Sequence, residues 1–157
     1  MISVKKIRFD HINIVVDDID LMSHFYSNVI GLNVFNKARI SGGWADRVVG
    51  LKGVEADVVI LNGCDGPNIE LIRYIAPEGT RQDQLTIPNT KGLRHIAFQV
   101  NDIHGVVDAC ARKGVRFHSE VQEVPTAQIP QEGNLKKRLV YFEDPEGTLL
   151  ELCSYEP

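Results

Sequence analysis

The stretch RHIAFQVNDI, residues 94–103, decides how this chain folds, because an altered copy of it occurs earlier as DHINIVVDDI, residues 10–19. When His11 is laid on His95 (95 − 11 = 84), an isoleucine, a valine, an aspartate and a second isoleucine coincide at four further positions. The matches agree in order and in spacing. They favour an internal duplication over coincidence.

A second pair of similar segments lies downstream of these two, at 58–74 and 139–155. Here Glu70 falls on Glu151 (151 − 70 = 81), and a glycine, a leucine and a tyrosine coincide around them. Each half of the chain therefore supplies one histidine and one glutamate, each within an apolar segment.

Length and composition narrow the class of protein. A chain of 157 residues has room for one ordinary domain or for two half-size units. A net charge of −4 with interspersed signs gives no reason to expect nucleic acid as a partner. No apolar run approaches the roughly 20 residues of a membrane helix, and residues 1–8 lack the apolar centre of a signal peptide. We therefore expect no membrane partner. With three cysteines and no CxxC spacing, we expect a cytoplasmic protein with reduced thiols.

Turn residues and hydrophobic periodicity predict the same β-α-β-β-β order in both halves. Predicted strands cover 9–16, 32–40, 55–62 and 68–75 in the first half, and 93–100, 115–124, 137–143 and 148–155 in the second. Asp18 and Asp102 are placed to cap the two helices, which Gly31 and Gly114 end. The segments 41–43 and 125–133 have the composition of loops.

These elements predict an α+β fold, a single domain over 1–157. Its first βαβββ unit would span 1–78, a connection 79–91 and its second unit 92–157. Pairing the two sheets edge to edge would build one curved mixed sheet, with helices outside and a concave face inside.

Side chains alternate across a strand, so His11 shares a face with Asn13, and His95 shares a face with Gln99. The opposite face of the first strand is aliphatic and is predicted to pack under the helix, which leaves the histidines on the concave side. An ionised carboxylate within an apolar strand, such as Glu70 or Glu151, is costly to desolvate unless it is paired or bound to a metal.

Taken singly, a strand histidine is usually hydrogen-bonded or half-exposed, and a strand glutamate usually faces water. The doubled set of His11, Glu70, His95 and Glu151 favours one shared divalent ion instead. Imidazoles and carboxylates without thiolate suit nickel, cobalt, zinc, manganese or ferrous iron.

The paired units and the four candidate ligands resemble the vicinal oxygen chelate superfamily. The similarity rests on DHINIVVDDID with FYSNVIGL, IELIRY, RHIAFQVNDI and FEDPEGTLLEL, and it covers nearly the whole chain. That superfamily includes glyoxalase I, methylmalonyl-CoA epimerase, extradiol dioxygenases, fosfomycin thiol transferases and metal-free drug-binding proteins. The resemblance also implies a homodimer, since the family commonly forms one.

The His-Glu-His-Glu set resembles that of bacterial-type glyoxalase I, and the epimerase differs by a glutamine at the position of Glu70. Both reactions remove a proton next to a carbonyl, so the resemblance implies a metal-dependent lyase or isomerase acting on a small α-oxo or thioester substrate. It implies that Glu151 is the base. Glu70 would be the second carboxylate ligand or the reprotonating group.

The surroundings of the ligands leave alternatives open. Val15 stands where short bacterial glyoxalases I have an arginine that helps to hold glutathione, and Glu55 is the only glutamate near the position of the epimerase's other catalytic glutamate. Trp44 and Arg47 follow the Gly42-Gly43 break and are predicted, with Asn13 and Gln99, to contact the substrate, the first two as a lid. Arg47 could meet a carboxylate or phosphate of the substrate, and the alternative for its segment is a surface loop. The basic residues at 136–138 could serve an anionic group in the same way, and the alternative for them is a solvent-exposed strand start.

Two other functions compete with the lyase or isomerase. A non-catalytic protein that binds a drug or metabolite is one, although a metal-free binder would not be expected to keep all four ligands. An iron-dependent extradiol dioxygenase is the other, although such enzymes have no carboxylate ligand at the position of Glu70.

Overall fold

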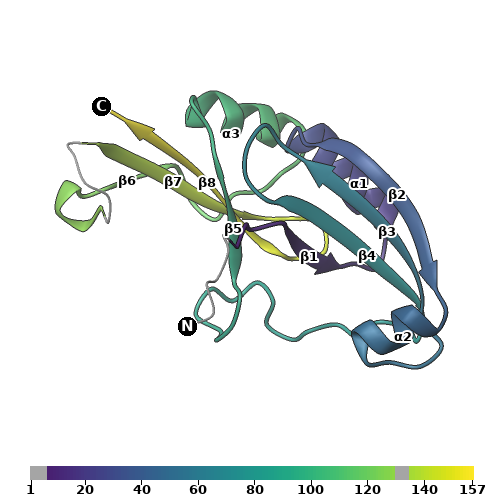
Figure 1. Cartoon of the computed structure of the whole chain (residues 1–157). Helices are drawn as coiled ribbons and strands as arrows, with labels where there is room; N and C mark the ends of the chain where they lie inside the picture. Colours follow the sequence, from purple (N-terminus) through teal and green to yellow (C-terminus); the bar gives the residue numbers. More distant parts are fainter. Residues whose placement is uncertain (1–6, 130–134) are drawn as a thin grey trace. The chain divides into compact units, whose positions relative to one another are not determined.

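The computed structural model describes residues 7–129 and 135–157, which fall into two compact units divided between Arg81 and Gln82. The division lies inside the segment 79–91 that the sequence marks as a connection. Each unit contains a four-stranded mixed sheet and helices in βαβββ order, which confirms the predicted fold class (Figure 1).

The first unit carries its four strands in the order β1-β4-β3-β2. Its elements are β1 (His11–Val15), α1 (Ile19–His24), a π-helical continuation η1 (Phe25–Val29), β2 (Asn33–Ser41), α2 (Gly43–Val49), β3 (Glu55–Asn62) and β4 (Asn68–Ala76). β1 runs parallel to β4, and the other neighbours are antiparallel.

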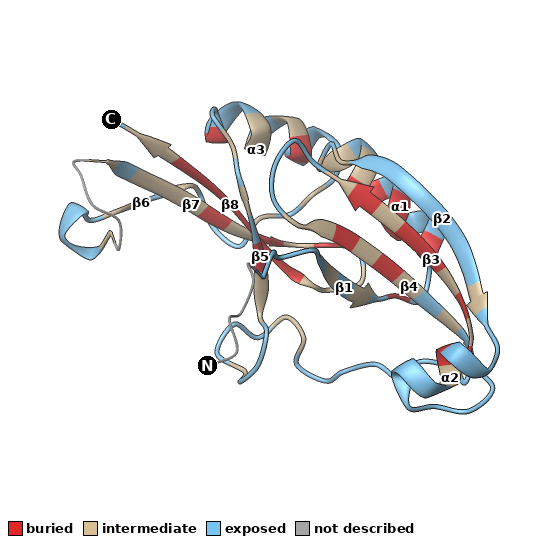
Figure 2. Ribbon diagram, viewed as in Figure 1, coloured by how far each residue is buried: buried red, intermediate tan, exposed pale blue. Residues whose placement is uncertain are grey.

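The first helix forms where the sequence predicts it, because Asp18 caps it. The Asp18 Oδ1 atom accepts hydrogen bonds from the backbone N–H groups of Asp20 and Leu21, at 3.1 and 2.9 Å. Met22 and Tyr26, one turn apart, are both fully buried, and α1 contacts β3 and β4. Burial alternates along β3 and β4, whereas the edge strand β2 is almost wholly exposed (Figure 2).

The second unit repeats this order as β5-β8-β7-β6. Its elements are β5 (His95–Gln99), α3 (Ile103–Arg112), β6 (Gln122–Val124), a 3₁₀ turn η2 (Thr126–Gln128), β7 (Lys136–Glu143) and β8 (Leu149–Glu156). β5 runs parallel to β8, and Asp102 caps α3 through the backbone N–H of Gly105 at 3.0 Å. Phe142, Leu150 and Leu152 form the buried centre of this sheet.

Two predicted segments differ in the structure. The stretch after Ser41 is the helix α2 rather than a loop, because the Asp46 carboxylate accepts hydrogen bonds from the backbone N–H groups of Gly53 and Val54 and closes the segment onto itself. The predicted strand 115–124 is reduced to β6.

The shortening of β6 has a local cause. Ser119 Oγ and Gln122 Nε2 both donate to the Glu120 carbonyl, and such side-chain bonds compete with a strand ladder. Upstream, Phe117 contributes only an isolated bridge to Phe142. The predicted loop 125–133 contains η2, and its residues 130–134 lie outside the described residues. Residues 1–6, which belong to the segment that lacks the pattern of a signal peptide, also lie outside them. In the described part of the chain, no helix is long and apolar enough to cross a membrane.

Candidate metal site in two halves

The first half of the candidate site lies on β1 and β4. Their parallel register sets Asn68 opposite His11 and Glu70 opposite Asn13. The buried neighbours Ile69 and Leu71 point to the opposite face, where α1 packs. We term the face that carries the histidine and the glutamate the ligand face of each sheet.

Within this half, His11 Nε2 lies 3.6 Å from Glu70 Oε1. Asn13 Nδ2 donates a hydrogen bond to the same Glu70 oxygen, at 3.0 Å. The other ring nitrogen of His11, Nδ1, lies 2.8 Å from Asp10 Oδ2. The first half is therefore a histidine–glutamate pair with an amide and a carboxylate that orient it.

The second half lies on β5 and β8, at the equivalent strand positions. His95 Nε2 lies 3.4 Å from Glu151 Oε2. The parallel register sets Ala97 opposite Glu151, and Tyr141 faces Glu151 from β7. The Lys137 ammonium lies 3.9 Å from Glu151 Oε1.

The donor atoms of both pairs fit a divalent ion. Two ligands that each lie about 2.1 Å from an ion, at octahedral or tetrahedral angles, are separated by about 3.0–3.4 Å. The observed Nε2–Oε separations of 3.4 and 3.6 Å are at or just above that range. Ligation through Nε2, with Nδ1 bonded to a carboxylate as in His11, is the usual second-shell arrangement of a metal-binding histidine.

Each unit supplies a pair of ligands rather than a complete cage. Among the described residues, no group of three or more histidine, cysteine, aspartate or glutamate side chains is arranged to hold a metal ion.

Hydrogen bonding, burial and neighbouring charges shift the pKa values of three groups around the pairs. The hydrogen bond to Asp10 raises the pKa of His11 above 6.5, against a lowering by burial. Burial raises the pKa of Tyr141, and the Glu151 carboxylate raises it further. Burial lowers the pKa of Lys137, but Tyr155 and Glu151 outweigh it and the net shift is upward. Glu151 therefore sits between a protonated phenol and an ammonium ion.

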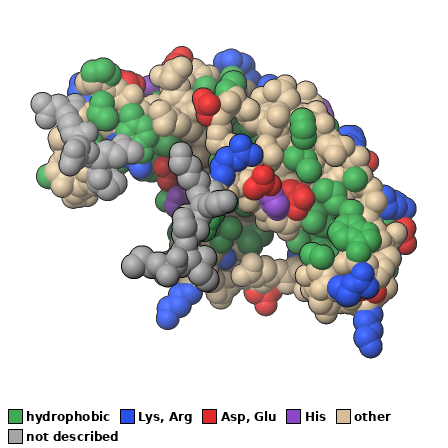
Figure 3. Space-filling model, viewed as in Figure 1, with side chains coloured by type: hydrophobic (Ala, Val, Ile, Leu, Met, Phe, Trp, Pro, Cys, Tyr) green, Lys and Arg blue, Asp and Glu red, His purple; other side chains and the backbone are tan. Residues whose placement is uncertain are grey.

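The four predicted substrate-binding residues lie in three places. Asn13 contacts Glu70, and Gln99 lies on the ligand face at the end of β5, opposite Cys153. Trp44 and Arg47 lie on α2, which contacts β2, the edge of the sheet remote from β1. Trp44 is 54% exposed, and hydrophobic side chains reach the surface where α2 lies (Figure 3). The lid function of α2 remains a prediction.

Two polar residues of the second half were not predicted for this position. The sequence favours an exposed strand start at 136–138, but the Lys137 side chain is only 17% exposed. Pairing the predicted hairpin 137–143 with 148–155 would have set Lys137 and Tyr141 on the same face as Glu151, because alternate residues share a face. Glu55, by contrast, forms an ion pair with Arg39 at 3.0 Å on the surface of β2 and β3.

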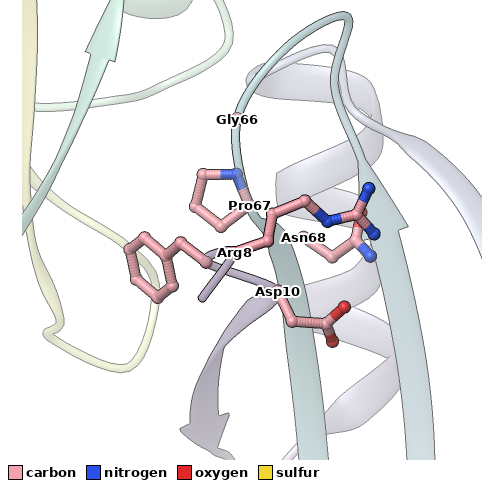
Figure 4. A pocket seen from close by; sticks show the side chains of 6 residues that line it. Arg8, Asp10, Gly66, Pro67 and Asn68 are labelled. Carbon is pink, nitrogen blue, oxygen red and sulfur yellow. The ribbon is translucent and has the colours of Figure 1, made fainter. Parts of the chain in front are cut away.

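A cavity of about 390 Å³ lies beside the first pair, between the start of β1 and the β3–β4 turn. Its walls are Arg8, Phe9, Asp10, Gly66, Pro67 and Asn68. Arg8 and Asn68 extend to the same side of the backbone there, and the Asp10 carboxylate lies below them (Figure 4). Asp10 and Asn68 are the hydrogen-bond partner and the register partner of His11, so the cavity adjoins the histidine.

Comparison with known proteins agrees with this architecture. The profile of the Glyoxalase/Bleomycin resistance protein/Dioxygenase superfamily matches residues 8–152. The uncharacterized protein YaeR of Escherichia coli (strain K12) is 31% identical over 156 residues, covering 97% of this chain and 98% of its own. The chain belongs to this superfamily.

Solved structures of similar proteins extend the match. A glyoxalase family protein from Bacillus cereus is 31% identical, with a TM-score of 0.80 over 100% of this chain and 99% of its own. The trypanothione-dependent glyoxalase I of Leishmania major has a TM-score of 0.62 and 21% identity, covering 95% of this chain and 87% of its own, and shows the shared fold.

Proposed function

We propose that this protein is a divalent-metal-dependent lyase or isomerase that removes a proton next to a carbonyl of a small α-oxo or thioester substrate. The observation that carries the proposal is the repeated pair: His11 with Glu70, and His95 with Glu151, each with Nε2 facing a carboxylate oxygen at equivalent strand positions. The four side chains together would hold one ion, of nickel, cobalt, zinc, manganese or iron.

A bound divalent ion supplies Lewis acidity to the substrate oxygens. The chain supplies the base, and Glu151 suits this role because its side chain is only 7% exposed and Tyr141 faces it from the neighbouring strand. A base shielded from water keeps the abstracted proton near the substrate for its return. Glu70, oriented by Asn13, serves as the second carboxylate ligand or as the group that returns the proton.

The glyoxalase-type ligand set favours this function over two others. A metal-free binding protein has no use for two matched histidine–glutamate pairs. Ring cleavage by an extradiol dioxygenase needs open positions that a fourth, anionic ligand at Glu70 would fill. We further propose a homodimer, as is common in the family, that acts on a small molecule in the cytoplasm, without a nucleic-acid or membrane partner.

The function is tested by metal analysis followed by proton exchange. We expect purified protein to contain a stoichiometric divalent ion and, in deuterated water, to exchange the proton α to the carbonyl of candidate α-hydroxy thioesters or acyl-CoA compounds. Metal without exchange across a broad panel would favour the binding protein. Turnover of catechols only with ferrous iron would favour the dioxygenase.

A further inference from the structure

The two ligand faces differ along the strand next to each glutamate. Glu70 pairs with Ile60 on β3, and Glu151 pairs with Tyr141 on β7. Continuing along each strand on the same face, β3 carries Val58 and Ala56, and β7 carries Leu139 and Lys137. The first face is thus lined by aliphatic groups where the second has a phenol and an ammonium ion.

Lys137 is held in place beside Glu151. Its Nζ atom lies 5.4 Å from the centre of the Tyr155 ring. An ammonium ion has three N–H donors and can bind an anionic acceptor. The Nζ–Oε1 distance to Glu151, 3.9 Å, is too long for a hydrogen bond.

The neighbouring basic residue on β7 is used differently. Arg138 points to the other face and binds Glu156 at 2.6 Å and Glu123 at 3.2 Å. Its role is structural, as a cross-strand link. Lys137 has no carboxylate at such short range in the described part of the chain, and its head group faces the acid that performs the proposed chemistry.

We propose that Lys137 binds an anionic group of the substrate, a carboxylate or phosphate close to the reacting carbon, and so determines specificity. This inference rests on the proposed function and adds the charge of the substrate to it. The Lys137 Nζ atom lies 3.9 Å from Glu151 Oε1, so an anion bound to this ammonium would lie beside the proposed base. The first face, with Ile60, Val58 and Ala56 at these positions, offers no equivalent charge.

The test uses two chelating probes of equal chain length, succinic monohydroxamic acid and butyrohydroxamic acid, which differ by a carboxylate. Calorimetry measures their affinity for the zinc-loaded protein, after titration with zinc alone. We expect the carboxylate to improve binding about tenfold, the size of one hydrogen bond to a charged group. Lys137→Met should bring the ratio of the two affinities close to one.

Lys136→Met is the matched control, because Lys136 is exposed and alternates to the other side of the same strand. It should keep the preference, and Lys137→Arg should retain most of it. Equal binding of both probes by the wild-type protein, or a preference that survives in Lys137→Met, would overturn the role of Lys137 alone. A protein that binds neither zinc nor either probe would instead overturn the metal-dependent function.

Discussion

The two halves of the candidate site share their ligands and differ in what surrounds them. In the first pair, the His11 and Glu70 side chains are 43% and 20% exposed, and an amide orients the carboxylate. In the second, the His95 and Glu151 side chains are 35% and 7% exposed, and a phenol and an ammonium ion lie beside the carboxylate. The residue before each histidine also differs in charge, Asp10 in one half and Arg94 in the other.

This difference suggests that, after duplication, both halves kept a pair of metal ligands and only the second half supplies the base. A ligand needs only the right donor atom in the right place, which both halves retain. A base also needs to be shielded and to face the substrate, and the second half offers such a setting. The following experiments test that asymmetry.

The largest effect, on the rate of proton exchange, is expected when each glutamate is replaced in turn by glutamine. Glu151→Gln should lower the rate of substrate proton exchange by about 10²–10⁴-fold, the usual contribution of a general base. Glu70→Gln should reduce the rate much less, with the larger fractional loss falling on metal occupancy. Exchange rate and metal content, measured on the same samples, separate the two. Equal loss of rate in both variants would abolish the proposed distinction.

Truncation of equivalent core leucines tests whether the two units are packed equally well. Leu71 and Leu152 are nearly fully buried beside Glu70 and Glu151 on the opposite face of each sheet. Leu71→Ala and Leu152→Ala should each lower the free energy of unfolding by about 2–5 kcal/mol. Urea unfolding followed by circular dichroism measures both. The single tryptophan, Trp44, reports on the first unit, and its fluorescence transition should respond to Leu71→Ala. A loss below about 1 kcal/mol at either leucine would show that this unit repacks around the cavity.

Removal of the helix caps should have a smaller effect. Asp18 accepts two backbone hydrogen bonds at the start of α1, and Asp102 accepts one at the start of α3. Substitution by alanine should cost about 1–2 kcal/mol at Asp18 and about 0.5–1 kcal/mol at Asp102. Thermal unfolding of the two variants gives the order, and asparagine at each position, which also caps, is the control. A larger loss of stability at Asp102 than at Asp18 would mean that the number of hydrogen bonds does not determine how much a cap stabilises its helix.

The smallest effect is a pH dependence that we expect from the His11–Asp10 pair of the first half. Asp10→Asn should lower the pKa of His11, because the hydrogen bond to Asp10 is the main cause of its upward shift. A raised folded-state pKa stabilises the fold below the unfolded value, near 6.5, and this contribution is lost as the pH rises through the folded pKa. Because protons compete with metal for the imidazole, the variant should also bind metal down to a lower pH. An NMR titration of metal-free protein measures the pKa, and an unchanged value would exclude Asp10 as the cause.

Much of the fold followed from local patterns. The strand 55–62 is observed with its predicted ends, and both helix caps lie where aspartate precedes the apolar periodicity. Prediction was wrong for α2 and for the length of β6. In both places, hydrogen bonds between side chains and nearby backbone changed the outcome: Asp46 accepts them, and Ser119 and Gln122 donate them. Hydrophobic patterning carries no information about such bonds.

By itself, the sequence determined the duplication, the superfamily and the four candidate ligands, because a residue that recurs at the same strand position can be recognised without knowing how the strands pack. The register between strands is what the tertiary structure decided. It set each histidine 3.4–3.6 Å from its glutamate, although 56 to 59 residues separate them along the chain (151 − 95 = 56; 70 − 11 = 59). It also turned Lys137 and Tyr141 towards Glu151 alone. Alternation assigns a side chain to a face, but only the pairing of β7 with β8 determines which carboxylate it meets.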